Sequence, residues 1–280
     1  MTAYPATTAT GPGPAPVNAG ARRFALITFT LAKNEFKVRY FGSVLGYLWS
    51  LMRPLMLFGV LYVVFTHVVR FGGDIEHYPL KLLLAIVMWS YFSEVTGQSV
   101  SALVQREGLL RKVPFPPAVI PLSVVLTGAF NFGLNLCVVL VFVAVTGIAP
   151  TVSWLELLPL VALLLLLAAA VSMLLAVLYV PFRDMAPIWE VVTQMLFWGT
   201  PIIYVIETAP EGVRELLMMN PLAAIIEQAR HAVIDPSAPA AATAAGGTAR
   251  LLIPLAIVVA VLVASVVLYR RAASTLAERL

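Results

Sequence analysis

Charged residues are scarce in this chain of 280 residues. Asp, Glu, Lys and Arg together make up 11% of it, whereas hydrophobic residues make up 61%. A soluble domain carries about 25% charged residues. With a mean hydropathy of +0.94, the composition excludes an ordinary soluble domain and predicts a membrane protein. The net charge of +4 is small, and we expect no nucleic-acid partner.

Cysteine, histidine and the common catalytic motifs are also nearly absent. The single cysteine, Cys137, excludes a disulfide within the chain and the usual cysteine-based metal spacings. No HExxH, GxSxG or CxxC pattern occurs, so we expect neither a metal site nor catalytic residues. The nucleotide-binding pattern GxxxxGK[ST] is missing as well. We therefore expect no cofactor on this chain, and an ATP-driven process would need a separate ATPase.

The first 20 residues lack the apolar core of a signal peptide. They are rich in Pro, Gly, Thr and Ala, and a segment of this composition buries too little apolar surface to fold. We expect residues 1–20 to be a disordered cytoplasmic tail.

Long apolar runs are what the chain does have. About 20 apolar residues cross the hydrocarbon core of a membrane as a helix. Because backbone groups in lipid must be hydrogen-bonded internally, these runs predict an all-α integral membrane fold. Six transmembrane helices are expected within residues 44–280: Leu45–Val69, Leu80–Leu103, Ala118–Val145, Trp154–Val180, Ile188–Ile206 and Leu251–Tyr269.

Lys and Arg are unevenly distributed between the loops. With the N-terminus in the cytoplasm, twelve of the 18 lie on the cytoplasmic side and five on the outer side, with Arg53 at the edge of the first span. Cytoplasmic loops of membrane proteins carry the excess of Lys and Arg. We therefore expect a multi-pass protein of the plasma (inner) membrane with both termini in the cytoplasm.

The segment before the first span, Ala21–Tyr40, is too charged to cross a membrane. Its apolar positions that share a helical face are Phe24, Ile27, Leu31 and Val38. This pattern predicts an amphipathic helix at the inner membrane interface, to which we assign residues 21–43. The alternative is a solvated basic flank that only sets the topology.

The outer segment 207–250 contains two short apolar pieces separated by Asn220-Pro221. The second piece has apolar residues at helical spacing, with Glu227 and Arg230 among the polar ones between them. We expect short helices that either re-enter the membrane or lie on its outer surface.

Glu94 is an ionisable residue well inside the second expected span, next to Ser93, Thr96 and Gln98. Ionisable residues inside spans are candidates for function. No acid or base at a similar depth is evident as a proton-relay partner, so Glu94 is expected to face a pore or another helix.

Aromatic residues also occur deep in the expected spans, where they either stack on the apolar faces of sugar rings or pack helices together. These residues are Trp89, Tyr91, Phe92, Phe197 and Trp198.

Four ordered motifs resemble those of the permeases of ABC-type polysaccharide exporters, over roughly residues 22–270. The first is FKVRYFGSVLGYLWSLMRPL, with Arg39, Tyr40, Ser43, Leu45, Gly46 and Trp49 at the matching positions. The second is the KV.FP core of the proline-rich loop 105–121, matched by Lys112, Val113, Phe115 and Pro116. The third is Phe182-Arg183-Asp184, and the fourth is TPIIY followed by Asn220-Pro221-Leu222 with Glu227 and Arg230. Phe182 stands in place of the usual Tyr, and Pro117 in place of a polar residue.

This resemblance implies a homodimer that pairs with two copies of an ABC ATPase, which binds ATP and Mg²⁺. The cargo would be a lipid-linked glycan such as O-antigen, teichoic acid or galactan. Membrane lipids would be further partners. Loop 105–121 would be a coupling helix that docks on the ATPase through Arg106, Glu107, Leu109, Leu110, Arg111, Lys112 and Phe115.

The resemblance also implies roles for the other candidate residues. The lipid pyrophosphate would meet Lys37, Arg39, Tyr40 and Arg53 at the inner interface. The glycan would pass Trp89, Tyr91, Phe92, Glu94, Phe197 and Trp198, and Arg183 with Asp184 would form a salt-bridged cytoplasmic loop. The outer gate would consist of Asn220, Pro221, Glu227 and Arg230 within residues 207–250.

The sequence leaves two other functions open. A related ABC permease would export a drug or a small lipid. An integral-membrane enzyme acting on lipid-linked sugars would need acidic or histidine residues at a membrane face, and Asp184 with Glu190 is the one cytoplasmic acidic pair in the sequence.

Overall fold

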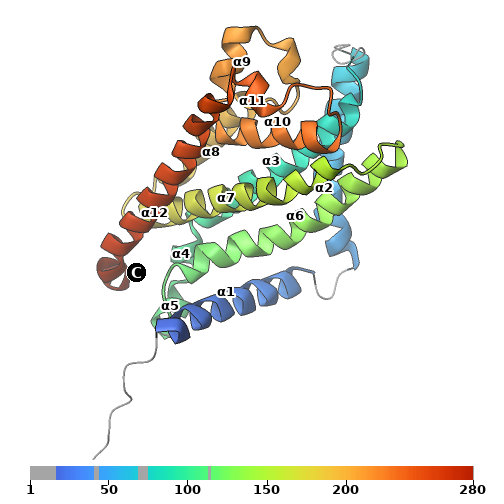
Figure 1. Ribbon diagram of the computed structural model, residues 1–280. Helices are drawn as coiled ribbons and strands as arrows, with labels where there is room; N and C mark the ends of the chain where they lie inside the picture. The colour runs from blue at the N-terminus through green and yellow to red at the C-terminus, as the bar shows by residue number, and fades with distance from the viewer. Residues whose placement is uncertain (1–16, 41–43, 69–74, 113–114, 280) are drawn as a thin grey trace, which may run out of the picture.

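The computed structural model describes residues 17–40, 44–68, 75–112 and 115–279 (Figure 1). All regular structure in these ranges is helical, which confirms the all-α prediction for the described residues. The long helices are α1 (Val17–Tyr40), α2 (Val44–Val63), α3 (Tyr78–Val100), α6 (Val119–Val145), α7 (Leu157–Tyr179), α8 (Met185–Trp198) and α12 (Leu252–Arg279). The short ones are α4 (Ala102–Gln105), α5 (Glu107–Lys112), α9 (Glu211–Leu217), α10 (Pro221–Val233) and α11 (Ala241–Ala244).

Four helical segments are long and apolar enough to cross a membrane: Tyr78–Val100, Val119–Val145, Val152–Tyr179 and Thr248–Ala272. They match the second, third, fourth and sixth expected spans, so this is a multi-pass membrane protein. For the first span, α2 continues as a π-helix over Val64–Val68, and its apolar stretch is Leu51–His67.

The expected fifth span is wrong in its extent. A helix was expected up to Ile206, but α8 ends at Trp198 and has 14 residues, or about 21 Å at 1.5 Å per residue. Pro201 explains the early end, because proline donates no N–H and forces the preceding residue, Thr200, out of the helical conformation. The chain from Thr200 to Val205 is irregular and largely buried.

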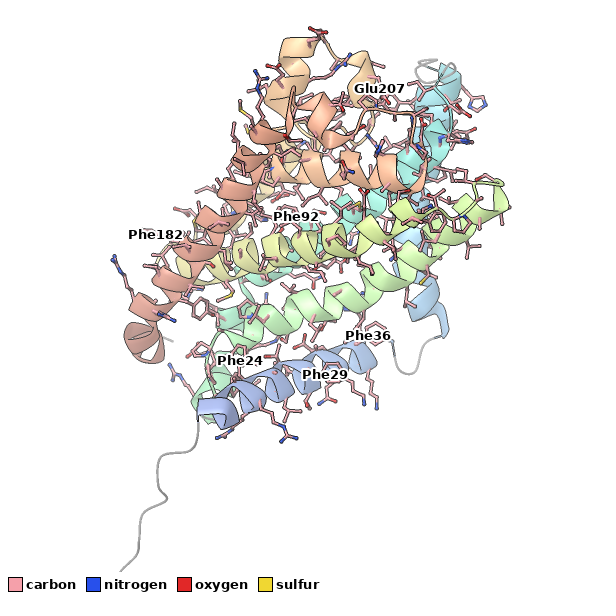
Figure 2. All side chains as sticks on the ribbon, in the orientation of Figure 1. Phe24, Phe29, Phe36, Phe92, Phe182 and Glu207 are labelled. Atoms are coloured by element: carbon pink, nitrogen blue, oxygen red, sulfur yellow. The ribbon has the colours of Figure 1, made fainter. Side chains whose placement is uncertain are left out.

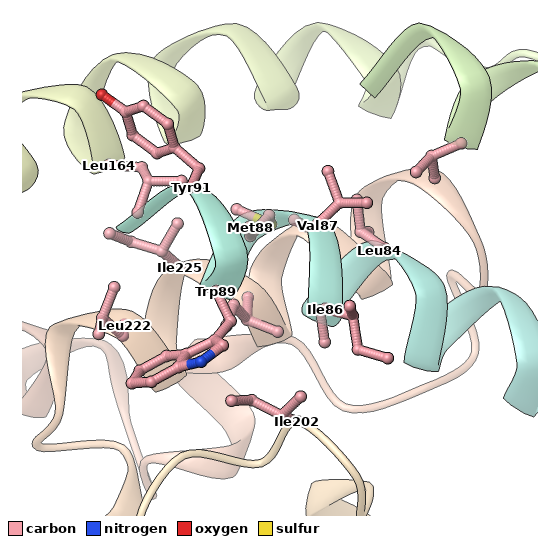
Figure 3. Packing of buried hydrophobic residues seen from close by; sticks show 14 of the residues in the cluster. Leu84, Ile86, Val87, Met88, Trp89, Tyr91, Leu164, Ile202, Leu222 and Ile225 are labelled. Atoms are coloured by element: carbon pink, nitrogen blue, oxygen red, sulfur yellow. The ribbon is translucent and has the colours of Figure 1, made fainter. Parts of the chain in front are cut away.

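Helix α3 forms the centre of the molecule, with seventeen of its 23 residues buried. It packs against α6, α7, α2, α8 and α10. Figure 3 shows Trp89 of α3 beside Leu222 of α10 and Ile202 of the segment after α8. By contrast, α7 and α12 expose large apolar side chains such as Leu158 and Val263. A helix surface of this kind is suited to contact with lipid.

Gly128 allows α6 to approach α3 closely. A Cβ atom at Gly128 would lie 2.2 Å from Cγ1 of Val95, which is itself buried. Val95 is β-branched and has few alternative rotamers in a helix. We predict that Gly128→Ala lowers the free energy of unfolding by about 1–3 kcal/mol through overpacking.

The matched control for this prediction is Gly133→Ala in the same helix. Nothing lies within 4 Å of a Cβ atom at Gly133, and alanine is the better helix former. Thermal unfolding of the purified variants checks the prediction, because Gly128→Ala should melt below wild type and Gly133→Ala should not. Equal melting temperatures for the two variants would contradict it.

Helix α1 packs against α6 at the edge of the helix bundle (Figure 1). Ala32 is fully buried, and the rings of Phe29 and Phe36, labelled in Figure 2, both contact Phe130 edge-on. The helix begins at Val17, four residues before the expected start at Ala21, so residues 17–20 are helical and not part of a disordered tail. The last proline of the tail precedes Val17, so no residue up to Ala21 forces the helix to stop.

Segment 207–250, which was expected on the outer side, contains α9, α10 and α11. The expected break at Asn220-Pro221 does separate α9 from α10. Asn220 caps α10, since its side-chain oxygen accepts a hydrogen bond from the Leu222 N–H at 3.0 Å. Pro221 occupies the first turn, where its missing N–H is tolerated.

Candidate functional site

A cavity of about 1000 Å³ opens between α2, α3, α6 and the end of α1. Its polar lining residues are Arg39, Arg53, Ser90, Ser93, Glu94, Gln98, Asn131 and Asn135. Trp89 and Tyr91 also line it. The cavity thus brings together residues from both sets that the sequence assigned separately, to the lipid pyrophosphate and to the glycan path.

Arg39, Glu94 and Gln98 form a closed ring of hydrogen bonds at the cavity. The Arg39 guanidinium donates to Glu94 Oε1 at 3.1 Å and to Gln98 Oε1 at 3.0 Å. Gln98 Nε2 in turn donates to Glu94 Oε1 at 2.9 Å. The sequence revealed no partner for Glu94, and the structure supplies Arg39, which lies 55 residues earlier in the chain. Glu94 therefore makes an interhelical polar contact.

The α6 side of the cavity carries two asparagines. Asn131 is 7% exposed, and its side-chain oxygen has no hydrogen-bond partner among the described residues. Asn135 donates to the Asn131 backbone carbonyl at 2.9 Å and leaves that side-chain oxygen unpaired. A buried oxygen without a donor is costly, so this group is ready to accept a hydrogen bond from a ligand. Sequence analysis missed both asparagines, although amides in an apolar run were a visible signal.

The remaining pyrophosphate candidates are placed as follows. Arg53 lines the cavity with an exposed side chain. Lys37 is exposed on α1. The side chain of Tyr40, like Ser43, Leu45, Gly46 and Trp49 of the same motif, lies outside the described residues.

A second cavity, of about 780 Å³, lies between α3 and α8. Four aromatic residues line it: Trp89, Trp189, Phe197 and Trp198. Ser93, Thr193, Glu190 and Gln194 supply polar groups. Three of the expected path aromatics thus border this space.

Phe92 lines neither cavity. It is buried in the core, where its ring contacts Trp89 and Trp189. Of the two uses expected for the aromatics, Phe92 has the packing role. Tyr91 is buried too, with its ring 4.9 Å from that of Phe132, although it borders the first cavity.

Loop 105–121 contains a short helix, α5, as expected for a coupling element. Leu109 is 38% exposed, whereas Leu110 and Phe115 are half-buried and pack against a small apolar cluster that includes Leu103 and Tyr269. Arg111 pairs with Glu107 at 2.6 Å, and Lys112 is exposed. Val113 and Pro114 of the expected motif lie outside the described residues. Leu109 is therefore the more exposed of the two leucines of α5.

Arg106 is directed toward α1. Its guanidinium lies 2.9 Å from Glu35 Oε1 on α1. Glu35 also accepts from the hydroxyls of Ser123 at 3.4 Å and Thr127 at 3.5 Å on α6. Arg106 was expected at the contact with the ATPase. It instead forms an internal ion pair, which links α1 to the start of α5. Glu35 was missed in the sequence because it is one charge among several on α1.

The loop before α8, which was expected on the cytoplasmic side, differs from expectation. Asp184 and Arg183 are exposed, and Arg183 lies over the Tyr179 ring at 5.1 Å. No salt bridge joins Arg183 to Asp184 within the described residues. The guanidinium uses the aromatic face as its partner because a cation–π contact is available one turn earlier.

Buried charges cluster near the N-terminal end of α3. Lys81 lies 2.7 Å from Asp235 and 3.8 Å from Glu207. Arg230 pairs with Glu227 at 3.2 Å, and both are almost fully buried. Arg230 also donates to the backbone carbonyls of Lys81 at 3.1 Å and Ile202 at 2.9 Å. The expected gate residues Glu227 and Arg230 therefore bind α10 to α3 and to the irregular segment after α8.

Burial raises the pKa of Glu227, and the nearby Glu207 raises it further, while Arg230 opposes both. For Asp235, burial would raise the pKa, but the hydrogen bonds from Lys81 and Ser237 lower it to about 2. Among the described residues, no group of three or more His, Cys, Asp or Glu could hold a metal ion.

The chain is similar in sequence to a transporter family and to several polysaccharide transport proteins. The family model of the ABC-2 type transporter matches residues 27–234. An O-antigen export system permease protein of Myxococcus xanthus is 35% identical over 204 residues, covering 71% of this chain and 77% of the relative. One from Klebsiella pneumoniae is 32% identical over 197 residues, covering 70% and 75%. A polysialic acid transport protein of Escherichia coli is 25% identical over 206 residues, covering 72% and 78%.

Proposed function

Because this chain belongs to the family of ABC-2 type transporters, we propose that it is the transmembrane subunit of an ATP-driven polysaccharide exporter. The observation that carries this proposal is the similarity to O-antigen and polysialic acid transport proteins over 70–72% of the chain. The family consists of transport permeases, so this chain acts as a transport subunit together with an ABC ATPase.

The finer parts of the proposal concern the assembly. We place two copies of this chain with two copies of the ATPase in the plasma (inner) membrane, with both chain termini in the cytoplasm. ATP and Mg²⁺ bind the ATPase. The cargo is a lipid-linked glycan that moves from the cytoplasmic to the outer side. In this arrangement α2 and α8, with the segments that follow them, complete a set of six spans, and α1 lies at the inner interface.

The first cavity suits the phosphate-bearing headgroup of such a lipid. Arg39 and Arg53 present guanidinium groups there, and the planar guanidinium binds phosphate oxygens in pairs. Glu94 is six residues from the cytoplasmic end of α3, which is about 9 Å along the helix. In the proposed topology, the charged end of the cavity is therefore near the depth of the inner headgroups.

The second cavity suits sugars. Trp89, Phe197 and Trp198 offer aromatic surfaces, and Gln194 and Glu190 offer hydrogen-bonding groups at the same space. Ligand sites commonly combine an apolar wall with a few placed polar groups.

The coupling element has a mechanical connection to the first cavity. Leu109 of α5 is available to the ATPase, and the Arg106–Glu35 pair joins the start of α5 to α1. Arg39 lies one turn beyond Glu35 on α1 and borders the first cavity. Movement of α5 would therefore be transmitted through α1 to the proposed headgroup site.

Two other functions are less well supported. A drug or small-lipid exporter of the same family would not need the large polar lining of the first cavity. An enzyme acting on lipid-linked sugars would need an acidic pair in a cleft, but Asp184 is exposed on a loop and lines neither of the two cavities.

Depletion of this protein in its own organism tests the proposed function. Lipid-linked glycans are then profiled by mass spectrometry, and a second assay determines which leaflet of the membrane holds them. We expect one polyprenyl-linked polymer to accumulate on the cytoplasmic side. Intact envelope glycans without such accumulation would contradict polysaccharide export and favour the drug or small-lipid exporter.

A further inference from the structure

We infer that Glu94 is a built-in competitor for the ligand of the first cavity and sets its charge specificity. Glu94 holds Arg39 in an ion pair at the cavity. A diphosphate group displaces Glu94 from Arg39, whereas a neutral headgroup does not. This inference rests on the proposed function, since it concerns how the exporter recognises the headgroup of its lipid-linked cargo.

The ring around Arg39 is arranged for such an exchange. Glu94 and Gln98 are one turn apart on α3, whereas Arg39 comes from α1. When Arg39 turns to a ligand, Glu94 keeps the hydrogen bond from Gln98 Nε2 at 2.9 Å. The carboxylate is thus not left without a donor when the ion pair opens.

The Arg39–Glu94 pair is also weak enough to open. The two side chains are 38% and 31% exposed, and pairs with this much exposure shift an equilibrium by only about fivefold or less. A diphosphate offers several anionic oxygens to one planar guanidinium, which gives stronger and paired hydrogen bonds. Arg39 therefore binds the diphosphate in preference to Glu94. A headgroup with a single neutral acceptor leaves the Arg39–Glu94 ion pair intact.

Asn131 independently indicates that the same cavity takes a ligand with hydroxyl groups. Its side-chain oxygen is buried, lines the cavity and lacks a donor among the described residues. Phosphate oxygens cannot donate to it, but a sugar hydroxyl can. A ligand with an anionic group at Arg39 and a hydroxyl donor at Asn131 corresponds to a sugar attached to a diphosphate.

Two substitutions with opposite expected effects on diphosphate affinity test this inference. The full-length protein is placed in lipid nanodiscs, and the binding of polyprenyl diphosphate, polyprenyl monophosphate and polyprenol is measured. Glu94→Gln removes the competing charge with little change in shape, and should tighten diphosphate binding by up to about fivefold. Gln98→Glu adds a second carboxylate next to Arg39, and should weaken diphosphate binding by a similar factor.

Polyprenol binding should be the same in wild type and both variants. Competition between inorganic pyrophosphate and polyprenyl diphosphate for binding would support recognition of the diphosphate group itself. Competition only by polyprenol would mean that the cavity recognises the lipid chain, and would overturn the inference.

The outcomes also separate this inference from the proposed function. Diphosphate binding by wild type with unchanged affinity in both variants would overturn the role of Glu94 alone. Failure of wild type to bind any polyprenyl diphosphate would overturn both this role and the lipid-linked cargo. Should Glu94→Gln fold poorly, as judged by its melting temperature, Gln98→Glu carries the test, since its predicted effect has the opposite sign.

Discussion

Replacing Arg230 with alanine is expected to lower the free energy of unfolding by about 3–5 kcal/mol, the cost of breaking a buried ion pair by removing one partner. Arg230 is 1% exposed. It satisfies Glu227 and also the carbonyls of Lys81 and Ile202. The substitution leaves a buried carboxylate and two carbonyls without their donor. Thermal unfolding of the purified protein and its level in the membrane both measure this loss.

The pH dependence of the Arg230→Ala variant gives a second readout. Burial already raises the pKa of Glu227 in the presence of Arg230, and without the guanidinium that pKa rises further. A carboxyl whose folded-state pKa lies above its unfolded value stabilises the fold increasingly as the pH falls through the folded pKa. The difference in stability between wild type and Arg230→Ala should therefore narrow on moving from neutral to acidic pH.

Arg250→Ala is the matched control for Arg230→Ala. Arg250 also forms an ion pair within segment 207–250, with Glu215, but both side chains are well exposed. An exposed pair contributes about 0–1 kcal/mol, so this variant should melt close to wild type. Similar melting temperatures for Arg230→Ala and Arg250→Ala would contradict the structural role of the buried cluster.

Replacing Leu109 with aspartate is expected to abolish ATP-coupled export while leaving the protein folded in the membrane. Leu109 is the exposed apolar residue of α5, so the change removes little internal packing. A charge at the centre of an apolar contact with the ATPase should cost 2 kcal/mol or more of binding, or about 30-fold in affinity. Co-purification of the ATPase and accumulation of the glycan at the cell surface measure the two effects.

Two comparisons sharpen this prediction. Leu216→Asp places the same change at an exposed leucine of α9, which the proposed topology puts on the outer side. It should leave ATPase binding unchanged. Leu110→Asp places it at a half-buried position that packs against Leu103 and Tyr269, and should lower the melting temperature. Normal ATPase binding and normal export by Leu109→Asp would contradict the assignment of α5 as the coupling element.

Several elements of this protein were predictable from sequence because their cause is local. Apolar length alone predicted the four helices that are long enough to span a membrane. Asn220-Pro221 predicted the break between α9 and α10, because a cap followed by proline starts a helix at that point. Thr200-Pro201 is a local signal for the end of α8, but the apolar residues that continue to Ile206 are equally typical of a membrane span.

The contacts of the candidate site had no such local cause. Glu94 meets Arg39 across 55 residues of chain, and Lys81 meets Asp235 across 154 residues. A charged residue in an apolar run indicates that some partner exists, but its spacing in the sequence does not identify that partner. Arg106 illustrates the consequence, since its sequence neighbours placed it at a surface and the fold pairs it with Glu35.

By itself, then, the sequence determined that this protein is a helical membrane protein with ordered motifs like those of polysaccharide-export permeases. Composition and periodicity suffice for this, because lipid requires every backbone group to be satisfied within its own helix. Only the tertiary structure decided which polar residues share a cavity, which charges are buried together and which leucine of α5 is free. These depend on how α1, α3, α6 and α10 pack against one another, and such packing brings together side chains that are far apart in the chain.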